Sequence, residues 1–280
     1  LKSALVIPGH STPWSYYGGL DVNPAGEIAV HTWNTVKGAR QYIPRIFPGR
    51  RRQGEIHVFD KHGKPVSLDV VGQGVSMGHG TQMDPRGDIY FLHKSNRVYD
   101  GKDFFPLTGT LIKFKRGKGR FLAARRAEVP LPEEQRPDFP PQIEGYWVKD
   151  AEWIYPAVGQ ARHNSPCQCW NSRFAMDVYG RSFAPETVRN QVAVLDSAGN
   201  LILHVGRYGN VDDGKPLVED GRFRTKPPRS IGGDEVALMY ACYTAVHSDR
   251  RLFIADAGNG RILSVKLGYH AEERVTVGEA

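Results

Sequence analysis

The sequence predicts an all-β fold, a β-propeller built from four-stranded antiparallel blades. The first observation is segment 171–208, which contains four short apolar runs, each ended by a turn. The second is that related strings recur along the chain, and the third is a composition of 31 Gly and 19 Pro without a long helical apolar period. One small antiparallel sheet is not stable alone, so repeated sheets are expected to stack on one another.

Within segment 171–208 the apolar runs cover 172–176, 182–185, 192–195 and 201–205. The string DSAGN at 196–200 has the composition of a hairpin turn in which Gly199 supplies the positive φ. We therefore expect four short strands that form one antiparallel sheet.

The same strand and turn order occurs four times. The strings LDVNPAGEIAVH, TQMDPRGDIYFLH and TAVHSDRRLFIAD align with AMDVYGRSFAPE on an anchor turn at Gly26, Gly87, Arg250 and Gly180, respectively. In chain order, a second hairpin begins 28, 22, 10 and 10 residues after the four anchors. A constant core with one variable connection is typical of a radial array whose loops lie on one face.

We expect one domain over 1–280, with blades at about 18–71, 72–124, 171–206 and 236–277 and inserts at 125–160 and 209–235. Propellers have four to eight blades, so the ring size stays open. The ring has four blades, or the inserts hide degenerate blades, or flanking sequence supplies the rest. The apolar string near 4–7 is typical of an edge strand of another blade, so we expect the chain to be part of a longer or processed protein.

The first insert contains VPLPEEQRPDFPP, which suits an extended strap. It is followed by Trp147 and Trp153, and the sequence leaves open whether this aromatic run is a lid over a ligand or a strand packed in a blade.

The net charge of +7 is concentrated in a few segments, including 40–52, which contains Arg50 and Arg51. These charges are either a solvated loop surface or a surface that attracts a polyanion. Few aromatic residues alternate with the basic ones, which disfavours nucleic acid and makes an acidic glycan or an acidic protein surface the expected partner. No apolar run approaches 18 residues, so no membrane span is expected.

The strings LDVNPAGEIAV, MDPRGDIYFL and FIADAGNGRILSVKL resemble NHL-type β-propeller repeats. The longer strings CWNSRFAMDVYGRSFAPE and VAVLDSAGNLILHVGRYGNVDDGKP resemble the C-terminal part of large uncharacterised bacterial NHL-repeat proteins, many of them exported. The resemblance implies a propeller and a periplasmic or extracellular location. NHL-like propellers include protein and RNA binders, lactonase-like hydrolases and an amidating lyase, so the fold does not determine the activity.

The repeat alignment predicts where functional residues gather, because equivalent positions of a propeller lie at equal radii. Eight residues before the anchors the sequence has Gly18, His79, Ser172 and Cys242. Six residues after the anchors it has Thr32, His93, Glu186 and Asp256. We expect these positions to line the axis of the ring.

Imidazole and thiolate ligands suit Zn²⁺, and carboxylates also suit Ca²⁺, so either ion is a candidate cofactor. The candidate metal site is His79, His163, Cys167, Cys169 and Cys242, and the alternative set is His93, Glu186 and Asp256. Buried inert cysteines, or a disulfide among them, are equally compatible with the spacing.

Three functions follow from these features. The first is a binding module, and its candidate ligand residues are Arg50, Arg51, Trp147 and Trp153. The second is a lyase on a uronic-acid polymer, in which a His or Tyr removes a proton and an Arg neutralises the carboxylate. Its candidate residues are His79, His163, Tyr240, Arg173 and Arg162.

The third function is a metal-dependent lactonase-like hydrolase that uses the alternative metal set. No P-loop, dinucleotide-binding fingerprint or HExxH string occurs in the sequence. The binding role is favoured because it requires only the architecture and the basic segments, while catalysis and the oligomeric state stay open.

Overall fold

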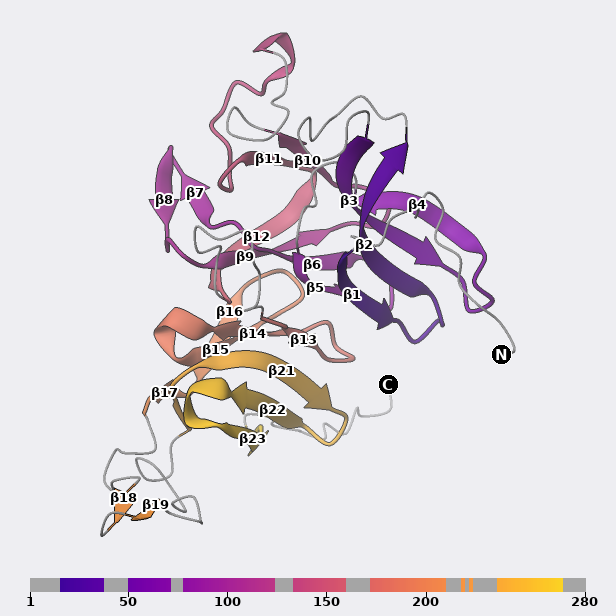
Figure 1. Cartoon of the computed structure of the whole chain (residues 1–280). Helices are drawn as coiled ribbons and strands as arrows, with labels where there is room; N and C mark the ends of the chain where they lie inside the picture. Colours follow the sequence, from indigo (N-terminus) through magenta and orange to yellow (C-terminus); the bar gives the residue numbers. More distant parts are fainter. Residues whose placement is uncertain are drawn as a thin grey trace, which may run out of the picture.

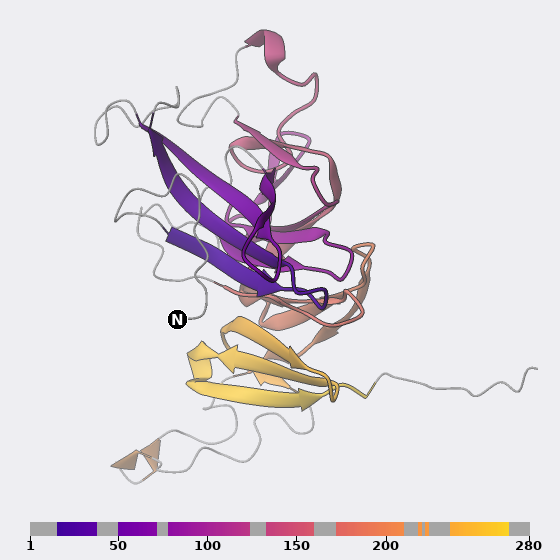
Figure 2. The same ribbon diagram turned by 90° about the vertical axis from the view of Figure 1, so that its right-hand side faces the viewer.

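The computed structural model describes residues 16–37, 50–71, 78–123, 133–159, 172–209, 218–219, 222–223 and 236–268 (Figure 1). These residues form β-strands and short 3-10 turns, with no α-helix among them. Within the same ranges, no helix has the length and apolar character needed to cross a membrane. Four antiparallel sheets follow one another from the indigo end of the ribbon to its yellow end (Figures 1 and 2).

The first sheet has the strand order β1-β2-β3-β4. Its strands are β1 (Tyr16–Val22), β2 (Ile28–Lys37), β3 (Arg50–Phe59) and β4 (Pro65–Val71). The ladder between β2 and β3 runs without interruption from the Ile28–Phe59 pair to the Lys37–Arg50 pair. The end of the expected basic loop at 40–52 is therefore part of a strand, and residues 38–49 lie outside the described chain.

The second sheet has the order β12-β9-β6-β5. Its strands are β5 (Gly78–Met83), β6 (Ile89–His93), β9 (Gly109–Phe114) and β12 (Ala151–Val158). We expected the run at 120–123 to supply the fourth strand, but this run is β10 (Arg120–Ala123), which pairs with β11 (Tyr146–Lys149) in a separate ribbon. Phe121 of β10 is 1% exposed and packs edge-on against Phe114. The ribbon therefore covers the core, and the insert supplies the outer strand of the sheet.

The third sheet matches the expected four strands in the order β13-β14-β15-β16. They are β13 (Ala175–Met176), β14 (Ser182–Glu186), β15 (Gln191–Leu195) and β16 (Leu201–Val205). The fourth sheet contains β21 (Ala241–His247), β22 (Arg251–Asp256) and β23 (Arg261–Lys266). Residues 269–280, where a further strand is expected, lie outside the described part of the chain.

Smaller elements lie in the connections. The two-stranded pairs are β7 (Arg97–Tyr99) with β8 (Lys102–Phe104), β17 (Arg207–Tyr208) with β20 (Ala237–Leu238), and β18 (Val218–Glu219) with β19 (Arg222–Phe223). The 3-10 turns are η1 (Glu133–Gln135), η2 (Thr187–Arg189) and η3 (Ala257–Asn259). The β7–β8 hairpin occupies the 22-residue connection of the second repeat, as the variable spacing predicts.

An aspartate fixes the turns of the repeats. Asp84 Oδ1 accepts hydrogen bonds from the backbone N–H groups of Arg86 and Asp88, both at 2.9 Å. Gly87, three residues after this aspartate, has a φ of 84°, which a residue with a side chain rarely adopts. Oδ1 atoms make the same pair of bonds at Asp60, Asp177 and Asp196.

The core consists of three apolar clusters, one between each pair of successive sheets. The second and third sheets, for example, enclose Tyr90, Leu111, Phe174 and Ala193. Repeated antiparallel sheets that stack face to face are the arrangement of consecutive propeller blades. The residues that the structure describes do not close into a ring.

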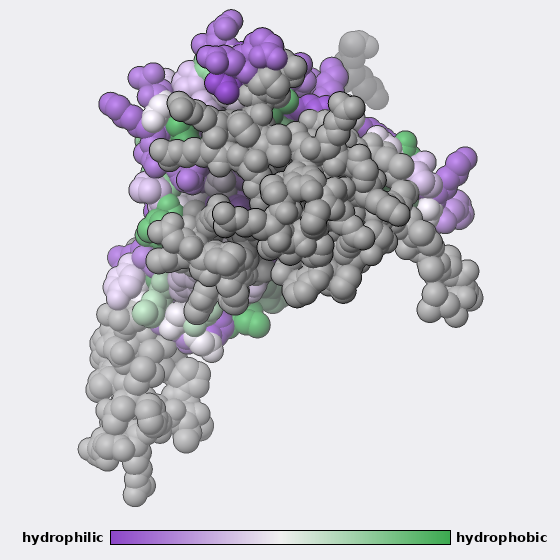
Figure 3. Space-filling model, turned by 45° about the horizontal axis from the view of Figure 1, so that its top comes forward, coloured by the Kyte–Doolittle hydropathy of each residue, from purple (hydrophilic) through white to green (hydrophobic). Residues whose placement is uncertain are grey.

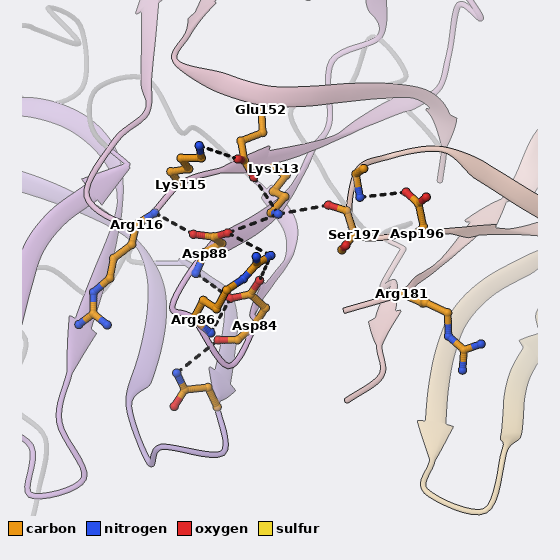
Figure 4. Close-up of polar contacts among 12 residues, drawn as sticks. Asp84, Arg86, Asp88, Lys113, Lys115, Arg116, Glu152, Arg181, Asp196 and Ser197 are labelled. Atoms are coloured by element: carbon orange, nitrogen blue, oxygen red, sulfur yellow. Dashed lines mark hydrogen bonds and ion pairs between the residues drawn. The ribbon is translucent and has the colours of Figure 1, made fainter. Parts of the chain in front are cut away.

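A buried lysine joins the second and third sheets (Figure 4). Lys113 Nζ lies 2.7 Å from Glu152 Oε2, 3.3 Å from Asp88 Oδ2 and 3.1 Å from the backbone oxygen of Ser197. Burial alone lowers the pKa of Lys113, but the hydrogen bond to Glu152 and the surrounding negative groups raise it above its usual value. The same hydrogen bond lowers the pKa of Glu152.

On the face shown in Figure 3, the described surface is mainly hydrophilic, and hydrophobic residues form small, separate areas. Isolated apolar side chains are normal on the surface of a soluble protein. This face therefore offers no extended apolar patch within the described part.

Candidate functional site

The first strands of the four sheets form one continuous row. Gly19 of β1 approaches β5 so closely that a Cβ atom there would lie 2.8 Å from Thr81 N. At Gly80 of β5 a Cβ atom would lie 3.4 Å from Cδ of Arg173. Arg173 then forms an isolated parallel bridge with Tyr243 of β21. These four residues occupy equivalent positions of the repeats, and we name them the inner row.

Arg173 is held in the inner row by its backbone. Its N–H donates to Cys242 O at 3.0 Å, and its carbonyl accepts from Thr244 N at 3.0 Å. The Thr244 hydroxyl also donates to Phe183 O at 2.7 Å, which ties the two last sheets together at this point. Arg173 is thus the one charged residue of the inner row, and it sits on a rigid part of the fold.

The guanidinium of Arg173 is half-buried. Its Nη1 donates to the backbone oxygen of Ser172 at 3.2 Å. Removal of water lowers the pKa of Arg173, and the nearby Tyr243 acts in the opposite direction. An arginine stays charged even so, because its usual pKa is above 12. Burial lowers the local dielectric, which strengthens its attraction for an anion.

The inner row differs by one residue from the ring expected from the alignment. Ser172 and Cys242, which we expected at the axis, are both buried within the sheets. Of the residues that follow them, Arg173 is half-buried and Tyr243 is exposed. The register of β1, β5 and β21 shifts directly before the inner-row residue, which is the mark of a β-bulge, so the position expected at the axis is the unpaired residue and the next one is paired.

Cys242 is poorly placed as a metal ligand. Its Sγ lies 3.5 Å from Ala255 O, inside the fourth sheet. Burial raises the pKa of the Cys242 thiol, which favours the protonated form over the thiolate that binds metals. Within the described residues, no group of three His, Cys, Asp or Glu side chains could hold a metal ion.

The rest of the expected metal site cannot be placed. His163, Cys167 and Cys169 lie outside the described residues, as does Arg162. His79 belongs to β5, and Arg50 and Arg51 belong to β3, but their side chains lie outside what the structure describes. The Cys/His site and the role of the arginines therefore stay predictions.

The residues of the alternative metal set end three strands of three different sheets: His93 ends β6, Glu186 ends β14 and Asp256 ends β22. Glu186 is fully buried and accepts a hydrogen bond from Tyr155 Oη at 2.8 Å and one from Gln191 Nε2 at 2.6 Å. His204 Nε2 and Arg189 Nη1 lie 3.3 and 3.4 Å from its Oε2 atom. These contacts use the carboxylate to join β12, β14, η2 and β16.

Asp256 has the same role in the fourth sheet. Its Oδ1 accepts hydrogen bonds from the N–H groups of Met239 and Tyr240, at 3.0 and 2.9 Å. Its Oδ2 accepts from Asn259 Nδ2 at 2.6 Å. His93, the third member of the set, is buried and stacks on Phe121. Each of the three side chains thus has structural contacts of its own, and Glu186 also joins the third sheet to Tyr155 of the second.

Tyr240, a candidate catalytic residue, is half-buried beside these contacts. Burial raises the pKa of Tyr240, which favours the protonated phenol over the phenolate that would accept a proton.

Of the two expected ligand-stacking tryptophans, Trp147 packs in the ribbon of β10 and β11, and Trp153 packs between the second and third sheets. Trp147 is 6% exposed, and its Nε1 donates to Phe139 O at 2.6 Å. Trp153 lies on β12, and its Nε1 donates to Ser197 O at 3.2 Å. The sequence left open whether this aromatic run is a lid over a ligand or a packed strand. In the structure it forms packed strands, and its apolar and aromatic residues fill the core around them.

Tyr243 is the inner-row residue that the sequence reasoning missed. It is 42% exposed and interacts electrostatically with Arg173. The repeat alignment contained the signal, because it places Tyr243 opposite Arg173, Gly80 and Gly19. What the alignment did not show is the shift in register directly before this position in β1, β5 and β21.

No family model and no curated protein matches the sequence. Similar solved structures include a calcium-binding protein, regucalcin, from Agrobacterium tumefaciens, with 13% identity, a TM-score of 0.38, and coverage of 94% of this chain and 66% of that one. Virginiamycin B lyase from Staphylococcus aureus with quinupristin has 10% identity and a TM-score of 0.37, with coverage of 91% of this chain and 57% of that one. An auxiliary nutrient binding protein from Bacteroides thetaiotaomicron has 11% identity and a TM-score of 0.35, with coverage of 88% of this chain and 46% of that one.

The chain thus spans between 46% and 66% of the length of these three proteins. At such TM-scores and identities the likeness does not decide the fold or the function of this chain.

Proposed function

We propose that the chain is a binding module of the β-propeller type that holds an anionic ligand at the inner row. The observation that carries this proposal is Arg173, a half-buried guanidinium fixed between β5 and β21. The resemblance to exported NHL-repeat proteins supports a location outside the cytoplasm, where acidic glycans are abundant ligands. We infer a uronate-containing glycan as the ligand.

The chemistry of the inner row fits such a ligand. A guanidinium can donate two parallel hydrogen bonds to one carboxylate, which makes it selective for planar anions. Gly80 has no side chain, so the stem of Arg173 packs directly over its backbone, beside the ring of Phe174. Tyr243 adds an exposed ring that suits stacking on a sugar next to its carboxylate.

Calorimetric titration with oligogalacturonate tests the proposal, and the methyl-esterified oligomer serves as the uncharged control. Loss of one hydrogen bond to a charged group costs about 1.5–3 kcal/mol, so Arg173→Gln is expected to weaken binding by about tenfold or more. The matched control is Arg120→Gln, which removes the same charge from an exposed arginine on β10. The proposal fails if the acid does not bind, or if both variants bind it as the wild type does.

The lyase remains the alternative, and one observation favours it. A parallel bridge pairs Tyr243 with Arg173, whose guanidinium could neutralise the carboxylate of a uronate. This pair would combine a proton-accepting group with charge neutralisation. Ultraviolet absorbance of unsaturated uronate products tests this alternative, and its absence with ligand bound would leave the binding role alone.

A further inference from the structure

The β7–β8 hairpin stands out from the second sheet and exposes two large aromatic rings (Figure 1). Its strands are joined by Asp100 and Gly101, whose φ values of 48° and 72° are those of a two-residue turn of type I′. Tyr99, directly before this turn, is 72% exposed, and Phe104 is 49% exposed. Aromatic residues are enriched in binding surfaces, because one rigid ring supplies a large contact area.

One face of the hairpin combines these rings with positive charge. In an antiparallel pair, residues directly opposite each other lie on the same face, as do residues two positions apart along a strand. The register therefore defines what we name the hairpin face, which consists of Arg97, Tyr99, Lys102 and Phe104. Asp103 pairs with Val98 on the opposite face, and Asp100 belongs to the turn. The hairpin face thus has two rings, two cations and no carboxylate.

The hairpin is fixed at both of its ends. Nη1 of Arg97 donates a hydrogen bond to Gln142 O, and the backbone N–H of the next residue donates to the same oxygen at 2.8 Å. At the other end, the ring of Phe105 packs edge-on against that of Phe104, with the centroids 4.6 Å apart. The guanidinium of Arg189, from the third sheet, lies over the Phe105 ring. A surface that is fixed in advance loses little entropy when it binds a ligand.

The backbone that follows β8 is strained. Phe105 and Leu107 have φ values of 51° and 65°, a left-handed conformation that bulky residues rarely adopt. Buried Thr108 holds this segment in place, because its hydroxyl donates to Phe105 O at 2.5 Å. Strained backbone persists only where the surrounding structure enforces it, and it gathers at functional sites. The strain is therefore a second sign of function, independent of the composition of the hairpin face.

The hairpin and the inner row lie at the same edge of the second sheet. Gly80 of the inner row pairs with Leu92, and the chain passes from there through the end of β6 into the hairpin. Across the sheet, β5 lies on one side and β12 on the other, and β7 contacts β12. Three strand spacings of about 4.8 Å place the hairpin roughly 14 Å from the inner row. A single sugar can contact one of the two surfaces, whereas a polymer can reach both.

We propose that the hairpin face is a second binding site for the same acidic glycan, so that the ligand is a polyuronate long enough to occupy both sites. This inference rests on the proposed function, because it starts from a uronate held at the inner row. Carboxylates of the polymer pair with Arg97 and Lys102, and the apolar faces of its sugars stack on Tyr99 and Phe104. Once one site is occupied, contact with the other is intramolecular, which increases the affinity.

Calorimetric titration with digalacturonate and with a long oligogalacturonate tests the proposal. The wild type is expected to bind the long oligomer at least about tenfold more tightly than the disaccharide. Tyr99→Ala should weaken binding of the long oligomer about fivefold and leave binding of the disaccharide unchanged. Lys102→Gln should act in the same direction, and its effect should disappear at high salt. Arg173→Gln, by contrast, should weaken binding of both ligands.

Tyr179→Ala is the matched control. Tyr179 is 74% exposed and lies in the turn after β13, at the opposite end of that strand from Arg173. This variant should bind both ligands as the wild type does. Circular dichroism spectra that match the wild type show that the variants fold.

The outcomes separate this inference from the proposed function. If Tyr99→Ala and Lys102→Gln bind the long oligomer as the wild type does while Arg173→Gln binds it more weakly, the inference is wrong and the proposed function stands. An equal loss for the disaccharide and the long oligomer in Tyr99→Ala would also overturn the inference, because the hairpin would then not be a separate site. If the wild type binds neither ligand, both proposals fail. Tighter binding of oligothymidylate than of the long oligogalacturonate would overturn the inference and indicate single-stranded nucleic acid instead.

Discussion

Replacement of Lys113 by Met tests how strongly the second and third sheets are joined. Methionine keeps the length of the side chain but removes the charge that contacts Glu152, Asp88 and the Ser197 carbonyl (Figure 4). Breaking a buried ion pair costs about 3–5 kcal/mol. The side chains of Asp88 and Glu152 are 13% and 26% exposed, so water can solvate them partly. We therefore expect a loss near the lower end, about 3 kcal/mol.

Lys115→Met is the matched control, because Lys115 contacts the same carboxylate at 3.2 Å but is 60% exposed. Exposed ion pairs contribute about 0–1 kcal/mol. The free energy of unfolding is measured by urea denaturation, with tryptophan fluorescence as the probe. If the two variants differ by less than about 1 kcal/mol, burial does not determine the strength of this contact and our reasoning is wrong.

Three further predictions concern residues near this interface. Burial raises the pKa of Tyr90 from 10.0 to about 12. The contribution of the neutral phenol to the free energy of unfolding is therefore complete below pH 10 and is lost as the pH rises toward 12. In urea unfolding, Tyr90→Phe should remove this part of the loss of stability at alkaline pH. Gly199 has a φ of 85°, and a Cβ atom there would lie 2.6 Å from Trp153, so Gly199→Ala should cost about 2 kcal/mol, and an unchanged unfolding midpoint would contradict this. Tyr155→Phe removes the donor to buried Glu186 and should cost about 2 kcal/mol in the same assay, whereas a neutral effect would mean that other donors satisfy the carboxylate.

The turns and the strand order of the third sheet were predictable because local chemistry specifies them. Asp177 and Gly180 define their turn through hydrogen bonds within five residues and a positive φ. All four residues of 192–195 are apolar, and successive residues of a strand point to opposite faces. The strand is therefore buried on both faces, as expected for a sheet between two others. No contact with a distant part of the chain is needed to read these elements.

The outer strand of the second sheet was not predictable in this way. The runs 120–123 and 151–158 have similar apolar character, and both follow the same strand. The choice between them depends on tertiary packing: Phe121 fits against Phe114 in the first cluster, while Trp153 reaches across to Ser197 of the third sheet. The contact of Trp153 joins residues 44 positions apart, which no local pattern encodes.

The candidate site shows where the repeat alignment reaches its limit. Alignment places residues at the same height of each blade, and the structure does bring Gly80, Arg173 and Tyr243 together. It does not say which face a residue occupies, because the register of β1, β5 and β21 shifts next to these positions and β13 consists of only two residues. The backbone bonds of Arg173 to β21 determine that face, and they hold a position just outside a regular strand. The proposed anion site therefore rests on one half-buried charge at a position where the equivalent residues are Gly and Tyr, and the Arg173→Gln titration tests it.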